Sequence, residues 1–225
     1  MRSACRHWLA AAVLFAGFVG LALAVRGDGA SWVLGLDARV GTALRGRGLA
    51  VADALSELAS WPVWTVLVVI GGTVLWRRGQ RGVALLLVLA DVSADLLALV
   101  SKLLVDRTPP GSTSSDLDAL LNGSFFPSGH AVRATVALGL ALALVVPRGS
   151  AWARAALPAV LALLLAVGAA RVAVHAHLAS DIVGGYLLGA AWVELTLGVA
   201  VSLSLRSRAH ERRLTAGAGD KAAPG

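Results

Sequence analysis

Six apolar segments dominate this sequence of 225 residues, and each is long enough or nearly long enough to cross a lipid bilayer. They cover approximately residues 8–25, 62–76, 82–105, 130–147, 151–172 and 181–203. A transmembrane helix needs about 20 apolar residues, because each residue adds only about 1.5 Å to its length. The second segment is short, and we expect it to extend upstream into residues 59–61. The sequence therefore predicts an all-α integral membrane bundle of six transmembrane helices.

The composition excludes an ordinary soluble domain. Hydrophobic residues make up 57% of the chain and charged residues only 15%, whereas about a quarter of the residues of a soluble domain are charged. The net charge of +7 does not indicate nucleic-acid binding, because the basic residues lie in short clusters between apolar segments and not in a patch interleaved with aromatic residues. The single cysteine, Cys5, excludes an internal disulfide and a multi-cysteine metal site.

The distribution of Lys and Arg predicts how the chain is oriented in the membrane. If the N-terminus is cytoplasmic, every short loop on the inner side is basic, through Arg2, Arg6, Arg77, Arg78, Arg81, Arg148 and Arg154. Cytoplasmic loops carry such an excess of positive charge. We therefore expect a multi-pass protein of the cell membrane with both termini in the cytoplasm. The loops 106–129 and 172–180 then face the extracytoplasmic side.

The segments outside the six spans divide into two kinds. Within residues 27–61, Leu36, Val40 and Leu44, and then Val51, Leu55 and Leu58, recur near helical spacing among charged residues. This pattern predicts two short amphipathic helices at the external interface, between the first and second spans. Residues 206–225 are basic and rich in Ala and Gly, which predicts a disordered cytoplasmic tail after a membrane domain of residues 1–205.

Polar residues mark the start of the fourth span. Pro127-Ser128-Gly129 precedes an apolar helix, and Ser128 suits the N-cap position. Capping alone would explain a lone Ser-Gly pair. A helix start also offers free N–H groups and the positive end of the helix dipole, which bind anions such as phosphate. His130 then lies in the first turn, beside any anion bound there.

A second polar group lies between the fifth and sixth spans. Asp181 follows His177 by four residues, so that both fall on one face of a helix. A carboxylate that accepts the Nδ1–H of an imidazole leaves Nε2 free to attack. His175 fits this pairing less well. Taken singly, Asp181 has an alternative role as an N-cap, and Arg171 as a span-end arginine that reaches for the interface.

Together, these residues form a set suited to phosphoryl transfer. The predicted topology places cationic groups, two histidines, a carboxylate and a helix N-terminus on one membrane face. Phosphoryl transfer needs positive charge around the phosphate oxygens, a nucleophile and an acid for the leaving group. The set supplies each of these without a metal or another cofactor.

Two of these motifs resemble signatures of a known family. Pro127-Ser128-Gly129-His130, and Arg171 followed by His177 and Asp181, are similar to two of the three signatures of the type-2 phosphatidic acid phosphatase family. That family shares its site with vanadium haloperoxidases. The resemblance covers residues from about 30 to 203. It implies a lipid phosphate substrate that is handled among membrane lipids.

The resemblance also implies a role for each site residue. His177 would attack phosphorus to give a phosphohistidine, and Asp181 would orient it. His130 would protonate the leaving oxygen and then act as base for the incoming water. The phosphate would be held by Lys102, Ser128, Gly129 and Arg171.

The first signature departs from the family pattern. That pattern places an Arg seven residues after a Lys, and counting from Lys102 puts Pro109 at this position. Arg107 lies two residues earlier and is the first candidate to bind the phosphate instead. Arg133, one turn beyond His130, is the second candidate.

The main hypothesis is a lipid phosphatase that acts outside the cytoplasm on a polyprenyl diphosphate, such as undecaprenyl diphosphate, or on a phosphatidate-type lipid. The alternatives are a catalytically weak or inactive relative that binds lipid phosphate head groups, and a membrane transporter. Asp91, Asp95 and Glu194 lie within spans, as carboxylates of a transporter often do. We expect Asp95 to neutralise Arg133 or Lys102. The sequence assigns neither the lipid nor an oligomeric state.

Overall fold

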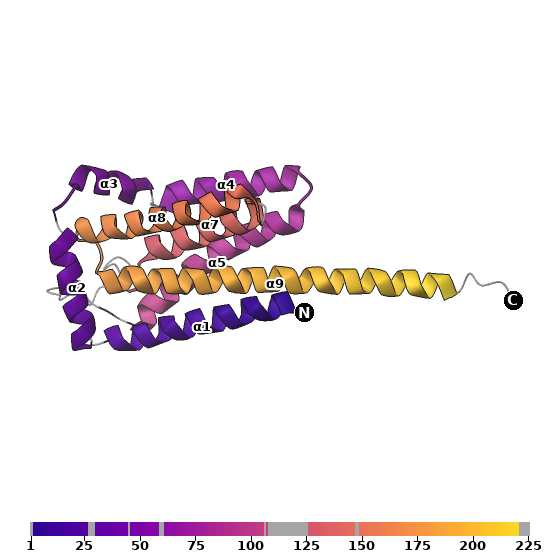
Figure 1. The fold of residues 1–225 in the computed structure, drawn as a ribbon, viewed down its shortest axis with the longest axis horizontal. Coiled ribbons are helices and arrows are strands. Elements are labelled where there is room, and N and C mark those ends of the chain that lie inside the picture. The colour runs from indigo at the N-terminus through magenta and orange to yellow at the C-terminus, as the bar shows by residue number, and fades with distance from the viewer. Residues whose placement is uncertain are drawn as a thin grey trace.

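In a computed structural model, the chain folds into helices (Figure 1). The structure describes residues 2–26, 30–44, 46–58, 61–105, 107, 126–146 and 149–220. The helices are α1 (Arg2–Val25), α2 (Ser31–Leu44), α3 (Leu49–Leu58), α4 (Trp61–Arg77), α5 (Arg81–Val105), α7 (Gly129–Val145), α8 (Ala151–Ala173) and α9 (Ala179–Asp220). The described residues contain no strand, and the prediction of an all-α fold is confirmed.

Within the described residues, four helices are long and apolar enough to cross a membrane, namely Ala4–Val25, Arg81–Val105, Arg154–Ala173 and Ala179–Ser204. The helices Pro62–Arg77 and Gly129–Leu144 are apolar but shorter. Large side chains on the long helices, such as Leu23, Leu89 and Leu165, are about two-thirds exposed. Such surfaces suit contact with lipid and not with water. The chain is a multi-pass membrane protein.

The two short helices predicted between the first two spans are present as α2 and α3. In Figure 1, α2 crosses one end of the bundle. Its buried residues are Val33, Asp37 and Gly41, spaced four apart on one face. Leu36, which the sequence analysis placed on the apolar face, is instead 51% exposed. The buried face of α2 therefore carries a carboxylate, and a buried carboxylate requires a partner.

The centre of the bundle is the contact between α7 and α9. A Cβ atom at Gly185 would lie 2.7 Å from the carbonyl oxygen of Ser128, and one at Gly189 would lie 2.8 Å from that of Val132. Glycines four residues apart let two membrane helices approach this closely. The backbone N–H of Ser128 donates to the carbonyl oxygen of Asp181 at 3.0 Å. The first turns of α7 and α9 are thereby held side by side.

Helix α1 packs along α9 (Figure 1) and supplies a partner for Glu194. The Nδ1 atom of His7 lies 2.6 Å from the Oε2 atom of Glu194. The sequence analysis left Glu194 unexplained. The structure gives it a role in joining α1 to α9, as expected of a carboxylate inside a span.

The C-terminal segment differs from the prediction. We expected disorder from residue 206, whereas α9 continues as a helix to Asp220. Ala, Arg, Glu and Leu in this segment favour helix. A helix that is already formed extends more readily than a new one nucleates. Residues 221–225 lie outside the described residues.

Candidate active site

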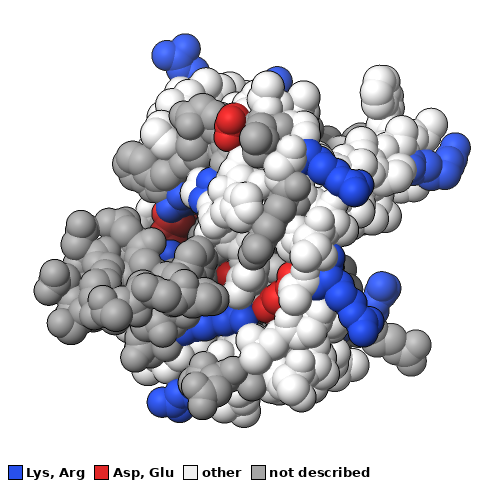
Figure 2. All heavy atoms as spheres, turned by 90° about the vertical axis from the view of Figure 1, so that its left-hand side faces the viewer, with Lys and Arg blue, Asp and Glu red and all other residues white. Residues whose placement is uncertain are grey.

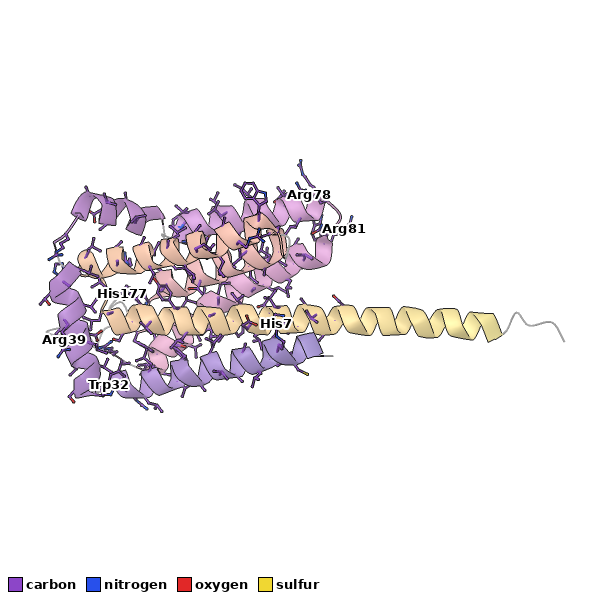
Figure 3. All side chains as sticks on the ribbon, viewed as in Figure 1. His7, Trp32, Arg39, Arg78, Arg81 and His177 are labelled. Atoms are coloured by element: carbon purple, nitrogen blue, oxygen red, sulfur yellow. The ribbon has the colours of Figure 1, made fainter. Side chains whose placement is uncertain are left out.

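The polar residues identified in the sequence gather at the end of the bundle that α2 crosses. Figure 3 places His177 at this end, near α2, and places Arg78 and Arg81 at the opposite end. Figure 2, which looks onto the His177 end, shows basic and acidic side chains set among uncharged ones. The candidate site therefore lies at one end of the bundle and not halfway along it.

His177 lies in the short connection between α8 and α9, and its side chain is buried. Its Nδ1 atom is 3.8 Å from Oδ2 of Asp181, which lies on the first turn of α9. This distance is longer than a hydrogen bond, but catalytic hydrogen bonds often shorten only when substrate binds. The same Oδ2 atom accepts a hydrogen bond of 2.8 Å from the backbone N–H of Leu178. The predicted pairing of His177 with Asp181 is thus present as a contact of 3.8 Å between Nδ1 and Oδ2.

The backbone before His177 explains how the ring is placed. Helix α8 ends in a Schellman motif, in which Ala176 N–H donates to the carbonyl of Arg171 at 3.0 Å and His175 N–H donates to that of Val172 at 3.1 Å. His175 occupies the left-handed position of this motif, with φ of 62°. Its side chain is exposed. His175 therefore reverses the chain and turns His177 inward.

Burial lowers the pKa of the His177 imidazole below the usual 6.5. The contact with Asp181 opposes this effect, and the charges of Arg171 and Lys102 add to it. The ring is therefore neutral at neutral pH, with one nitrogen able to act as a nucleophile.

This lowered pKa predicts how stability depends on pH. Below pH 6.5 the unfolded chain binds a proton at His177 that the folded chain does not, so the folded state loses stability as pH falls towards the folded-state pKa. A His177→Asn variant lacks this linkage. Between pH 6.5 and the folded-state pKa of His177, the free energy of unfolding of the wild type is expected to fall, relative to that of the variant, by about 1.4 kcal/mol for each pH unit. Thermal unfolding in detergent between pH 5 and 8 measures it, with His175→Asn as the exposed control. A wild-type stability that stays parallel to that of His177→Asn would contradict it.

The first turn of α7 holds Ser128, Gly129 and His130. Ser128 occupies the N-cap position, but its side chain makes no capping hydrogen bond. Its hydroxyl is fully buried and has no hydrogen-bond partner among the described residues. A Cβ atom at Gly129 would meet nothing within 4 Å among the residues that the structure describes. A buried hydroxyl, free helix N–H groups and open space at Gly129 together form a cradle that fits an anion.

Cationic side chains from three helices act electrostatically on the two histidines. The charges of Arg171, Arg133 and Lys102 act on the His130 ring, and so does His177. Lys102 and Arg171 also act on His177. Lys102 comes from the end of α5 and Arg171 from the end of α8. Four of the predicted site residues, Lys102, Arg171, His130 and His177, are therefore close enough for their charges to act on one another.

Arg107, expected to bind phosphate, is engaged elsewhere. Its Nη1 atom donates to Asp181 Oδ1 at 2.6 Å and to Ser180 Oγ at 2.7 Å, and its Nη2 atom donates to Asp37 Oδ2 at 3.0 Å. The side chain is buried. Both of its terminal nitrogens are thus held by these groups, and the expected contact of Arg107 with phosphate stays a prediction. Pro109 lies outside the described residues.

Arg133, the second candidate for the place of the family arginine, is paired with a carboxylate of α5. Its Nε and Nη2 atoms lie 2.8 and 2.6 Å from Oδ1 of Asp95, so the prediction that Asp95 neutralises Arg133 is confirmed. Asp91, one turn deeper on α5, is buried, and its Oδ1 atom has no hydrogen-bond partner among the described residues. Arg133 contributes positive charge near His130 while a carboxylate holds it.

The sequence analysis did not identify Asp37 and Ser180 as parts of this network. Ser180 donates to Asp37 through its backbone N–H at 2.8 Å and through its hydroxyl at 2.7 Å. The sequence signal for Asp37 was its spacing, four residues after Val33 and four before Gly41, which places it on the same helix face as both. Such a position on an amphipathic helix usually faces the protein. The described residues contain no group of three or more His, Cys, Asp or Glu that could hold a metal ion.

Comparison with known proteins gives this site a family. A model of the PAP2 superfamily matches residues 83–202, which is more than half of the chain. The chain belongs to the PAP2 superfamily. The matched region contains every site residue described above except Asp37. Membership in the PAP2 superfamily assigns the chain to a family of phosphatases.

A solved structure shares the PAP2 fold. It is the crystal structure of the first transmembrane PAP2 type phosphatidylglycerolphosphate phosphatase from Bacillus subtilis. The two structures superpose with a TM-score of 0.71 at 24% sequence identity, over 85% of this chain and 96% of the other. No curated protein sequence matches the chain. The superposition shows a shared fold over nearly the whole of both chains.

Proposed function

We propose that this PAP2 protein is a lipid phosphatase that hydrolyses a phosphomonoester or diphosphate of a membrane lipid through a phosphohistidine on His177. One observation carries the proposal. His177, buried against Asp181, shares an electrostatic environment with His130, Arg171 and Lys102. A nucleophile, an acid–base group and cationic groups thus meet in one site. The proposed substrate class includes polyprenyl diphosphates and phosphatidate-type lipids.

The proposed reaction has two steps. Nε2 of His177 attacks phosphorus, the bond from phosphorus to the leaving oxygen breaks, and that oxygen takes a proton from His130. Water then attacks the phosphohistidine and gives a proton to His130, the P–N bond breaks, and phosphate leaves. Asp181 stabilises the positive charge on the His177 ring, while Lys102 and Arg171 stabilise the phosphate oxygens.

The cradle at α7 is the proposed phosphate site, and Gly129→Ala tests it. The added methyl group enters the open space beside Ser128 and His130. Because alanine favours helix more than glycine, the fold is not expected to lose stability. We expect kcat/KM to fall about 10²–10³-fold, measured as phosphate release from detergent micelles. Gly20→Ala on α1, where a Cβ atom also meets nothing within 4 Å, is the matched control and should keep full activity. Equal activity of the two variants would exclude the cradle as the phosphate site.

A substrate panel tests the function itself. Purified protein is expected to release inorganic phosphate from at least one of polyprenyl diphosphate, polyprenyl phosphate, phosphatidate and phosphatidylglycerol phosphate. The proposed mechanism uses no metal, so EDTA should not reduce the rate. Failure to release phosphate from any of the four would reject the proposal.

A second candidate function follows from Arg107. Its guanidinium is held by Asp37 and Asp181, so the phosphate site has one cation fewer than the family pattern provides. Loss of one such group costs about 10²–10³-fold in rate. A weak or inactive relative that binds lipid phosphate head groups is therefore the alternative. Saturable binding of the same four lipids without phosphate release would favour it.

We further propose that α4 and α7 complete six spans, with both termini cytoplasmic and the site outside. Arg78 and Arg81 lie at the end opposite His177 (Figure 3), which the positive-inside rule assigns to the cytoplasm. Cys5, the single cysteine, is exposed. A membrane-impermeant maleimide is expected to label Cys5 only after cells are permeabilised. A Cys5→Ser/Asp53→Cys variant should be labelled in intact cells, and the reverse pattern would invert the topology.

A further inference from the structure

A buried group of three charges lies directly behind the candidate site. Arg107 donates to Oδ1 of Asp181 at 2.6 Å and to Oδ2 of Asp37 at 3.0 Å. All three side chains are at most 7% exposed. Buried charges persist only where other charges and hydrogen bonds satisfy them. We refer to Asp37, Arg107 and Asp181 as the charge triad.

The charge triad fixes the rotation of the Asp181 carboxylate. Oδ1 of Asp181 is held by Arg107, while Oδ2 accepts from Leu178 N–H and faces Nδ1 of His177. With both oxygens held, the carboxylate cannot turn away from the imidazole. Groups held this way need little reorganisation during the reaction.

Asp37 joins α2 to this arrangement. Its Oδ1 atom accepts a hydrogen bond of 2.8 Å from the backbone N–H of Ser180. This N–H lies in the first turn of α9, where backbone N–H groups have no acceptor within the helix. Its Oδ2 atom accepts from both Ser180 Oγ and Arg107. Asp37 thus caps α9 from a helix 143 residues away and also holds the far side of the Arg107 guanidinium. Without Asp37, Arg107 would keep one carboxylate partner instead of two.

The charge triad also carries a useful net charge. With one guanidinium and two carboxylates, it has an excess of one negative charge when all three are ionised. A phosphorylated His177 ring that keeps its Nδ1 proton is a cation, and an adjacent negative charge stabilises it. We propose that Asp37 is a positioning residue of the phosphatase reaction, acting through Arg107 and Asp181 on His177. This inference rests on the proposed function.

Asp37→Asn tests the inference, because it keeps the shape of the side chain and removes its charge. We expect kcat to fall about 10–100-fold with KM changed less than about twofold, since Asp37 is buried and acts through Arg107 and Asp181. The assay is phosphate release by the full chain in detergent, with whichever of the four panel lipids the wild type hydrolyses fastest. Asp53→Asn, an exposed carboxylate on α3, is the matched control and should match the wild type.

The pH dependence of kcat/KM distinguishes a positioning role of Asp37 from a purely structural one, because a purely structural role would not shift it. Asp37→Asn removes a negative charge, so the acidic limb of kcat/KM is expected to move to lower pH. Arg107→Gln removes a positive charge and should move it to higher pH. The double variant restores the wild-type net charge and should return the limb close to its original position. The other charged groups that act on His177, from Lys102, Arg171 and His130, are unchanged in all variants.

Two kinetic outcomes would overturn the inference. In one, Asp37→Asn keeps the kcat and pH profile of Asp53→Asn while the wild type releases phosphate. In the other, both single variants move the acidic limb in the same direction. If Asp37→Asn does not fold, the double variant, which keeps the net charge of the charge triad, carries the test. If the double variant has a kcat below that of the wild type and its acidic limb of kcat/KM at the wild-type pH, the result supports the inference. A kcat of the double variant equal to that of the wild type overturns it. Loss of phosphate release in the wild type would instead reject the proposed function.

Discussion

Replacing His177 with alanine is expected to lower kcat for phosphate release by about 10⁴–10⁶-fold, the range found when an enzyme loses its nucleophile. The expectation rests on placement. His177 is buried against Asp181 and shares its environment with Lys102 and Arg171, whereas the nearby His175 is exposed. Neither water nor His175 has the Asp181 contact that would let it replace the lost ring.

His175→Gly is the matched control for this experiment. It removes an imidazole two residues away and places glycine at a φ of 62°, where glycine is unstrained. We expect full activity and a gain in stability of about 1 kcal/mol. Rapid quenching with radiolabelled lipid phosphate should trap an acid-labile phosphohistidine in His175→Gly and none in His177→Ala. Substantial turnover by His177→Ala, or label on another histidine, would contradict the assignment.

The helices were largely predictable, because the bilayer imposes a simple rule on length and polarity. Runs of about 20 apolar residues marked α1, α5, α8 and α9. The shorter α4 and α7 were also found from their apolar character. The C-terminal segment was harder to predict. Its basic composition indicated disorder, whereas its helical propensity and the adjoining span favour the observed extension to Asp220.

The pairings within the site were predictable only where sequence spacing fixes geometry. His177 and Asp181 are four residues apart, and one helical turn brings them into contact. The pairing of Asp95 with Arg133 was inferred because a carboxylate inside a span requires a partner. Ser128 was expected at the N-cap position and among the phosphate-binding residues; it occupies the N-cap position, and its hydroxyl makes no capping bond. Sequence alone does not distinguish a capping serine from one that faces an anion site.

Long-range contacts explain why the partners of Arg107 were not predicted. The sequence places Arg107 near the position of the family arginine, and phosphate binding was therefore the hypothesis for its role. Its partners, Asp37 and Asp181, lie 70 and 74 residues away. The partner Asp37 is on α2, a helix predicted only as an amphipathic helix at the external interface. Spacing along the chain carries no information about such a contact, so only the folded structure could show it.

His130→Ala is expected to produce the second largest effect, a fall in kcat of about 10²–10⁴-fold on a lipid phosphomonoester. The alkoxide of a lipid alcohol is a strong base and a poor leaving group unless it is protonated. His130 is the proposed source of that proton, since it lies in the first turn of α7 and in the electrostatic environment of His177. When the substrate is a polyprenyl diphosphate, the leaving group is polyprenyl phosphate, a stabilised anion, so the loss should be smaller on polyprenyl diphosphate than on polyprenyl phosphate.

A substrate with an acidic leaving group separates the two proposed roles of His130. With p-nitrophenyl phosphate the first step needs no acid, so His130→Ala should form the phosphohistidine at nearly the wild-type rate. The second step still needs a base to activate water. The variant is therefore expected to release a burst of about one equivalent of nitrophenolate and then turn over slowly, as accumulation of a covalent intermediate requires. Stopped-flow absorbance measures the burst. Equal losses on the lipid and on the aryl substrate, without a burst, would show that His130 binds the phosphate instead of transferring protons.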